Sequence, residues 1–188
     1  MCHGSVVTFA LRHLTGPVCR DKRILEVGSR ILSGSLRKSL EALMPGEYIG
    51  VDILPGKGVD QVVAGGDLVK TFGKNTVDIV VCTELLEHAE NWSIVVSNIK
   101  RVCAPGGLIL VSARSPGFAY HRCPEDYWRF TVDDFKYIFS DLIPIDIRPD
   151  PFTPGVFCFA QKPSDFKMLR LSSFTVAKIR PVHRKDSR

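Results

Sequence analysis

Short apolar runs alternate with stretches of mixed polarity along most of the chain. The runs at 77–82 (VDIVVC) and 108–113 (LILVSA) are almost entirely apolar. Runs of this kind are typical of strands in a parallel sheet that helices cover on both faces. Less uniform runs predict five further strands, at 23–27, 47–51, 59–63, 143–149 and 155–163.

The stretches between these runs have the spacing of amphipathic helices. Helices are predicted at 35–44, 94–103 and 131–139, the last with Thr131 as N-cap and Asp134 as the carboxylate of a capping box. Strands that alternate with helices predict a doubly wound α/β fold, in which ligands bind beyond the carboxyl ends of the strands. A first helix is predicted from apolar residues on or near one face: Val6, Val7, Phe9, Ala10 and Leu14.

The length of 188 residues suits a single domain. No apolar run approaches the ~20 residues needed to span a bilayer, and the start of the chain has no basic leader or signal cleavage site. The six cysteines are scattered without a CxxC pair, a spacing that supports neither a zinc site nor a disulfide framework. We therefore expect a cytoplasmic protein that contacts no membrane.

The formal net charge of +5 is concentrated at the C-terminal end. Residues 164–188 contain seven Lys or Arg and two Asp, so residues 1–163 are electrically balanced. We expect a folded domain over 1–163 and a basic C-terminal tail over 164–188. Two interpretations of the tail stay open, a solvated segment or a contact with an anionic partner.

Polar and glycine residues follow the predicted strands at the edge where a ligand would bind. Glu26, Gly28 and Ser29 stand at the exit of the first strand, and Gly34 precedes the next helix. A glycine at this place lets the backbone approach a ligand closely. Asp52 ends the second strand, where an acid suits a bidentate grip on ribose hydroxyls.

Four segments in series carry a family resemblance: ILEVG, YIGVD, VDIVVCTELLEH and IKRVCAPGGLILVS. Their order and spacing resemble the successive motifs of class I S-adenosylmethionine-dependent methyltransferases, over about residues 22–162. The resemblance implies a Rossmann-like, mostly parallel seven-stranded sheet, S-adenosyl-L-methionine as cofactor, and methyl transfer as the activity.

The resemblance also implies roles for single residues. Glu26 would hold the amino-acid end of the cofactor, and Asp52 would bind its ribose hydroxyls. The other implied contacts are Gly28 and Ser29 beside the methionine part, Ile53 on the adenine, Asp67 and Leu68 at the adenine edge, and Thr83 and Glu84 beside the methyl group.

The first loop departs from the family pattern. Members usually have glycines two and four positions after the first one, where this chain has Arg30 and Leu32, so Gly34 is the candidate substitute. The helix that usually joins the second and third strands is replaced by the turn sequence LPGKG, which predicts a shortened connection.

A dinucleotide-binding Rossmann protein is an alternative with the same strand-end geometry. Its pyrophosphate site requires G-x-G-x-x-G at a helix N-terminus, and the segment GSRILSG lacks that spacing. An NAD-binding function is therefore disfavoured.

The segment SPGFAYHRCPEDYWRFTVDDF (115–135) follows the fifth predicted strand, where substrate-facing loops are common. Part of it, YHRCPEDYWRFT, resembles a segment of methyltransferases associated with sugars and cell-surface glycans. His121 is the candidate general base, because an imidazole titrates near neutrality. Tyr120, Tyr127 and Arg129 are further catalytic candidates. The structural alternative is that the aromatic residues pack the loop on the sheet while Arg129 pairs with Asp126.

Glu84, Glu87 and His88 have spacings that place them on one helical face. Some quinone-pathway methyltransferases use a similar arrangement for a metal ion. We expect no metal here, because the LEH tripeptide is common in this superfamily without one.

The sequence as a whole predicts methyl transfer to a small-molecule or glycan acceptor, at oxygen or nitrogen. Nucleic-acid methylation is disfavoured, because CTEL stands where base methyltransferases carry an NPPY-like motif; only the basic tail could contact nucleic acid. A non-catalytic cofactor-binding or scaffolding domain is the alternative, supported by Arg30 and Leu32 in the first loop.

Overall fold

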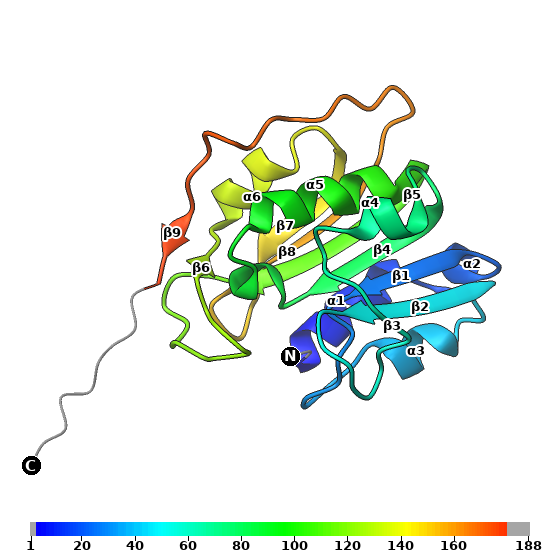
Figure 1. Cartoon of the computed structure of the whole chain (residues 1–188), viewed down its shortest axis with the longest axis horizontal. Coiled ribbons are helices and arrows are strands. Elements are labelled where there is room, and N and C mark those ends of the chain that lie inside the picture. The colour runs from blue at the N-terminus through cyan, green and yellow to red at the C-terminus, as the bar shows by residue number, and fades with distance from the viewer. Residues whose placement is uncertain (1–2, 180–188) are drawn as a thin grey trace, which may run out of the picture.

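The computed structural model describes residues 3–179, in which helices cover both faces of a seven-stranded sheet (Figure 1). The strand order is β3-β2-β1-β4-β5-β8-β7, and only β8 runs antiparallel to its neighbours. The predicted doubly wound, mostly parallel seven-stranded sheet is therefore confirmed. The strands are β1 (Arg23–Val27), β2 (Glu47–Asp52), β3 (Gln61–Val62), β4 (Val77–Thr83), β5 (Cys103–Arg114), β7 (Ile143–Pro149) and β8 (Gly155–Gln161).

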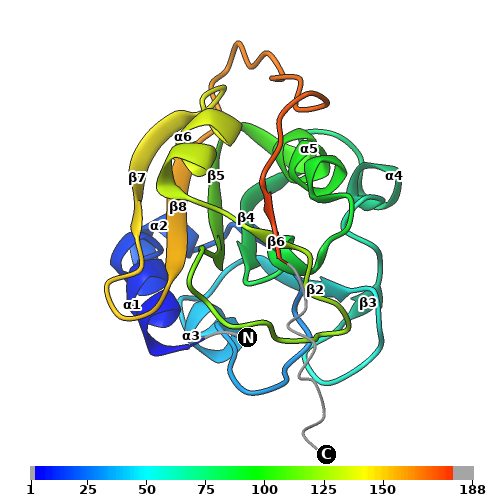
Figure 2. The ribbon, with the colours of Figure 1, turned by 90° about the vertical axis from the view of Figure 1, so that its left-hand side faces the viewer.

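Six α-helices divide into two groups of three. The helices α1 (Gly4–His13), α2 (Gly16–Cys19) and α3 (Arg37–Glu41) lie on one face of the sheet, and α4 (Leu68–Phe72), α5 (Trp92–Val102) and α6 (Val132–Ile138) lie on the other (Figures 1 and 2). A single 3₁₀ turn, η1 (Leu86–His88), follows β4.

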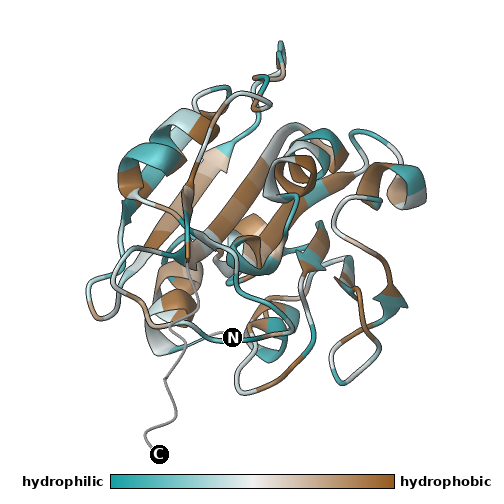
Figure 3. Ribbon diagram, turned by 60° about the vertical axis from the view of Figure 1, so that its left-hand side comes forward, coloured by the Kyte–Doolittle hydropathy of each residue, from teal (hydrophilic) through white to brown (hydrophobic). Residues whose placement is uncertain are grey.

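Alternation along the central strands explains why both faces are apolar. Ile24 packs with α1 and α3, whereas its neighbour Leu25 packs with α5 on the opposite face. Successive side chains of a strand point to opposite faces, so a strand covered on both sides needs an unbroken apolar run. Figure 3 shows the result, with apolar strands enclosed between helices that are polar outside.

Most predicted elements are present with shifted ends. The helix predicted at 35–44 is shorter, at Arg37–Glu41, and β3 is only two residues long. The capping box of α6 is confirmed, since Thr131 and Asp134 exchange hydrogen bonds of 2.7 and 3.1 Å. Two short helices, α2 and α4, were not predicted from any pattern in the sequence.

The connection between β2 and β3 contains no helix, as LPGKG predicted. The guanidinium of Arg37 in α3 donates hydrogen bonds to the carboxylate of Asp60 at 2.8 Å and to the carbonyl oxygen of Gly58 at 3.1 Å, and both acceptors belong to this loop. Asp60 also accepts a hydrogen bond of 2.7 Å from the backbone of Gly50. The loop is therefore short and anchored on β2 itself.

The first part of the predicted basic tail packs on the domain. Leu171 and Val176 are buried in the same core as α5 and α6, and Phe174 stacks on Tyr137 of α6 at 4.4 Å between ring centroids. The strand β9 (Ala177–Lys178) pairs with β6 (Trp128–Arg129) in a separate two-stranded sheet (Figure 2). The domain boundary at 163 stays a prediction, and residues 180–188 of the predicted tail lie outside the described residues.

Among residues 3–179, no helix is long and apolar enough to cross a membrane. The cysteines of the described part are free, and Cys82 and Cys158 are fully buried in β4 and β8.

Candidate cofactor site and acceptor loop

A cavity of about 220 Å³ opens at the carboxyl ends of β1, β2 and β4. The chain leaves β1 and β4 toward opposite edges of the sheet, so the cavity lies at the point where strand order reverses. Ligands of doubly wound sheets bind at this point. Its lining includes Gly28, Arg30, Leu32, Asp52, Ile53, residues 63–66, Glu84, Leu85, His88, Ala89, Cys123 and Pro124.

Gly28 makes the sharp turn that follows β1. Its φ of +82° lies in the left-handed region, and a Cβ atom here would stand 2.5 Å from Cδ1 of Leu85. The backbone N–H groups of Gly28 and Ser29 donate to the carbonyl oxygen of Val51, at 2.8 and 3.0 Å. Both the conformation and the space at this position therefore require glycine.

Asp52 ends β2 at the wall of the cavity. Its Oδ1 accepts from the backbone N–H of Leu54 at 3.0 Å, and its Oδ2 accepts from that of Arg30 at 3.3 Å. These contacts fix the carboxylate in direction, and a carboxylate can accept further hydrogen bonds at the same oxygens. Ile53 beside it is 52% exposed and offers an apolar surface to the cavity.

Glu26 lies beneath the cavity rather than in its lining. Its Oε2 accepts the hydroxyl of Tyr48 at 2.7 Å, and burial raises the pKa of Glu26 to about 7. The structure thus places this carboxylate behind the first loop, where any contact with a ligand would be indirect.

Five other residues predicted for the cofactor site are also outside the cavity lining. The cavity is lined instead by the segment 63–66, which directly precedes the predicted Asp67 and Leu68. The Gly65-Gly66 pair was the available signal, since adjacent glycines mark a close backbone approach. The five residues are Ser29, Gly34, Asp67, Leu68 and Thr83; Leu68 is fully buried in the core, and Ser29 is 3% exposed.

Glu84 occupies the end of β4 in a strained conformation. Its φ is +53°, which is rare for a residue other than glycine and is concentrated at functional sites. One carboxylate oxygen accepts the hydroxyl of Ser112 at 2.8 Å, and the other forms an ion pair with Arg114. Burial, followed by the nearby charge of Glu87, raises the pKa of Glu84.

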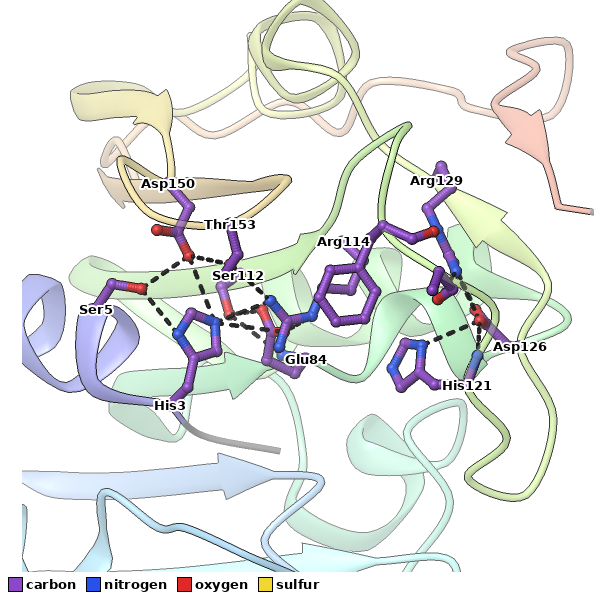
Figure 4. Close-up of polar contacts among 12 residues, drawn as sticks. His3, Ser5, Glu84, Ser112, Arg114, His121, Asp126, Arg129, Asp150 and Thr153 are labelled. Carbon is purple, nitrogen blue, oxygen red and sulfur yellow. Dashed lines mark hydrogen bonds and ion pairs between the residues drawn. The ribbon is translucent and has the colours of Figure 1, made fainter.

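The ion pair belongs to a network that reaches the first helix (Figure 4). Arg114 lies 2.9 Å from Nε2 of His3 and 3.2 Å from the hydroxyl of Thr153. Asp150 accepts from Ser5 at 2.8 Å. These contacts tie the floor of the cavity to the N-terminal helix and to the loop before β8, although neither had a functional signal in the sequence.

His121 belongs to the loop after β5 and lies on the opposite side of Arg114 from His3 (Figure 4). Its ring meets the ring of Phe118 edge-on at 5.0 Å between centroids. Its Nδ1 is 3.1 Å from Oδ2 of Asp126, and its ring meets the ring of His88 edge-on at 4.7 Å between centroids. His88 itself lines the cavity, so the two imidazoles connect the cavity to the loop. Burial lowers the pKa of both rings, which are therefore neutral near pH 7.

The other three catalytic candidates have structural contacts. Arg129 is 4% exposed and donates to both oxygens of Asp126, as the structural alternative expected. The backbone of Tyr127 bonds to Glu87 and to Ile179. The hydroxyl of Tyr120 donates to Glu125 at 3.3 Å. None of the three lines the cavity.

One group of potential metal ligands occurs among the described residues, and it differs from the set that the helical spacing suggested. Glu87, His88 and His121 offer ligand atoms that lie within 4.8 Å of one another. Glu84 does not belong to this group, because its carboxylate contacts Ser112 and Arg114 instead.

Comparison with known proteins identifies a family domain within the chain. Residues 25–111 match a family model described as a methyltransferase domain. No curated protein matches the chain in sequence.

Three solved structures are similar in fold. One is a chain of the complex between the Haloferax volcanii Trm112 methyltransferase activator and a methyltransferase (16% identity, TM-score 0.65, 85% of this chain and 89% of that one). The second is the Burkholderia thailandensis 1,6-didemethyltoxoflavin-N1-methyltransferase with bound 1,6-didemethyltoxoflavin and S-adenosylhomocysteine (15% identity, TM-score 0.64, 84% of this chain and 76% of that one). The third is the N-methyltransferase NodS of Bradyrhizobium japonicum WM9 (14% identity, TM-score 0.63, 84% of this chain and 94% of that one). The chain therefore has the fold of the class I, S-adenosylmethionine-dependent methyltransferases, and residues 25–111 match a methyltransferase domain.

Proposed function

We propose that the protein transfers a methyl group from S-adenosylmethionine to the oxygen or nitrogen of a small-molecule acceptor. The observation that carries this proposal is the cavity at the strand-order switch, with Gly28, Asp52 and the strained Glu84 around it. S-adenosylmethionine supplies the methyl group from a sulfonium centre when it is bound. The protein's task is then chiefly to orient the reacting groups and to exclude water.

The residues present suit this cofactor. Asp52 stands at the end of β2 with its carboxylate already oriented, and we propose that it accepts the two ribose hydroxyls. The turn at Gly28 leaves backbone free of a Cβ atom beside the methionine part. Ile53 and Val63 offer apolar contacts to the adenine ring.

We propose that the acceptor enters from the side of the loop after β5. His88 and Pro124 line the cavity on this side, and His121 stands directly behind His88. The ligand printed for the toxoflavin methyltransferase, 1,6-didemethyltoxoflavin, is a small molecule, and we propose an acceptor of that class here. In this proposal His121 acts on the acceptor and has no contact with the cofactor.

A cofactor-binding domain without catalysis is the second candidate. The specific observation in its favour is that Arg30 and Leu32 occupy the cavity wall where family members carry glycine. A side chain at this place narrows the space for the methionine part, so a protein that had lost the site would bind the cofactor weakly.

Isothermal titration of the purified chain with S-adenosylmethionine and S-adenosylhomocysteine is the first test. We expect saturable binding at one site, and the absence of heat at millimolar cofactor would refute the proposal. A panel of phenols, amines and small glycans, followed by mass spectrometry for a gain of one methyl group, then identifies the acceptor class. Cofactor binding without any methylated product across the panel would favour the second candidate.

A further inference from the structure

We propose that Glu87, His88 and His121 bind one first-row divalent transition-metal ion beside the cofactor cavity. The three side chains come from η1 and from the loop after β5, more than thirty positions apart along the chain. Their ligand atoms nevertheless lie within 4.8 Å of one another. A modest inward movement of each side chain would place all three at bonding distance from a shared ion.

The environment of the Glu87 carboxylate requires an explanation. Its side chain is fully buried, and neither carboxylate oxygen has a hydrogen-bond partner among the described residues. A buried carboxylate is costly unless it is paired or coordinates a metal. The backbone around it is well satisfied, since its carbonyl oxygen accepts from Tyr127 at 2.8 Å. Only the side chain is left without a partner.

One of the two imidazoles is oriented as metal ligands usually are. Nδ1 of His88 lies 2.5 Å from the carbonyl oxygen of Glu125, so Nδ1 carries the proton and Nε2 keeps its lone pair. Metal-binding histidines typically donate their second N–H to a carbonyl or carboxylate in this way. Nδ1 of His121 lies 3.1 Å from a carboxylate oxygen of Asp126 but makes no hydrogen bond among the described residues, so it is a further buried polar atom without a partner.

The chemistry of the three ligands selects the ion. Two imidazoles and one carboxylate suit zinc, cobalt, nickel, iron and manganese, whereas magnesium and calcium prefer sites made of oxygen. Three protein ligands leave at least one coordination position open. Because His88 lines the cavity, we place the open position toward the bound acceptor.

The role of the ion rests on the proposed function. An acceptor that offers an oxygen lone pair would complete the coordination and would thereby be held beside the methyl group. In this arrangement His121 acts on the acceptor through the ion.

Metal binding is tested on the full chain after dialysis against a chelator. Cobalt(II) is titrated while its visible absorption is followed, and zinc(II) and magnesium(II) are titrated by calorimetry. We expect one cobalt and one zinc per chain, with magnesium at least tenfold weaker. Glu87→Gln and His121→Ala should each weaken zinc binding at least tenfold, with folding checked by circular dichroism.

Two control variants make the result specific. Glu90→Gln changes an exposed acid near the site, and Asp133→Asn changes a highly exposed acid on α6; both should bind zinc as the parent protein does. Zinc binding that is absent, or that is equally strong in folded Glu87→Gln and His121→Ala, would overturn the metal site. S-adenosylmethionine binding is measured on the same samples, so that a failed metal site is distinguished from a failed cofactor site.

Discussion

Arg129 donates to both carboxylate oxygens of Asp126, at 2.5 and 2.7 Å, within the loop that carries His121. The same guanidinium donates to the carbonyl oxygens of Phe118 and Ala119, at 3.2 and 3.0 Å. Asp126 in turn accepts the backbone N–H of His121 at 2.8 Å. The loop is thus folded around one buried ion pair, through which Arg129 fixes the backbone at His121.

The first prediction concerns this ion pair. Arg129→Lys keeps the charge but loses the two-pronged geometry, which an ammonium group cannot reproduce. We expect the free energy of unfolding to fall by about 1.5–3 kcal/mol, the range for hydrogen bonds to charged groups, and turnover to fall while cofactor affinity is retained. Arg122→Lys is the control, because the side chain of Arg122 is 68% exposed in the same loop. Equal effects of the two substitutions would contradict the positioning role.

Asp52→Ala should weaken the binding of S-adenosylmethionine at least tenfold. Hydrogen bonds to a charged group are worth about 1.5–3 kcal/mol each, and Asp52 is the one acid at the end of β2. Calorimetry of the folded variant measures the change. Asp133→Asn, which alters a highly exposed acid on α6, serves as control. Unchanged affinity in Asp52→Ala would remove this residue from the site.

His121→Ala should lower turnover at least tenfold, because the side chain acts on the acceptor through the proposed metal ion and loss of a group that supports a metal site typically costs about 10–100-fold in activity. The affinity for S-adenosylmethionine should stay within a few-fold, because the ring stands behind His88 on the acceptor side. Full activity on the true acceptor would show that His121 is structural. Loss of cofactor binding would show instead that the loop covers the cofactor, and Tyr120 or Tyr127 would become the better candidate for acceptor contact.

The buried carboxyl group of Glu26 predicts a specific dependence of stability on pH. Burial raises its pKa to about 7 from its ordinary value of 4.5, so between these values the folded protein keeps a proton that the unfolded chain has released. The free energy of unfolding should therefore fall as the pH rises from about 5 to 7, by a contribution of ~3 kcal/mol from this group.

Glu26→Gln removes that contribution, and denaturant unfolding of both proteins across the pH range measures the difference. The raised pKa values of Glu84 and Glu87 act in the same direction but are common to both proteins. Parallel pH profiles for the parent protein and Glu26→Gln would show that Glu26 is ionised in the folded state at pH 5.

Leu171→Ala should destabilise the domain by about 2–5 kcal/mol, the usual cost of shortening a buried leucine. Leu171 is 7% exposed and packs in the core shared with α5 and α6. Leu11→Ala, at a residue 37% exposed on α1, should cost less. A truncation after Pro163 should also melt many degrees lower. If the truncated chain melts with the parent protein, residues 164–179 add nothing to stability.

The sheet was predictable because its central strands must be apolar on both faces, and 77–82 has no other plausible structure. The strand-end positions of Gly28, Asp52 and Glu84 followed from the same reasoning, and all three line the cavity. The C-terminal segment was harder. Its apolar residues are sparse, and only the partners Tyr137 and Trp92, distant in sequence, show that Phe174 is packed.

The relation of Glu87 to His121 could not be read from the sequence either. Helical spacing groups Glu84 with Glu87 and His88, but the 3₁₀ turn and the contacts of Glu84 with Ser112 and Arg114 separate them. His121 reaches the group only because the loop folds back over η1. Contacts of this kind depend on tertiary packing, which no local pattern encodes.

The pairing of β9 with β6 also has a consequence for the order of folding. The strands of the main sheet all precede residue 162, so the sheet can form before the C-terminal segment is in place. Ile179 donates to the carbonyl oxygen of Tyr127 at 2.8 Å, at one end of the loop that carries His121. The loop that carries His121 can therefore be fixed at this end only after the C-terminal segment has paired with it.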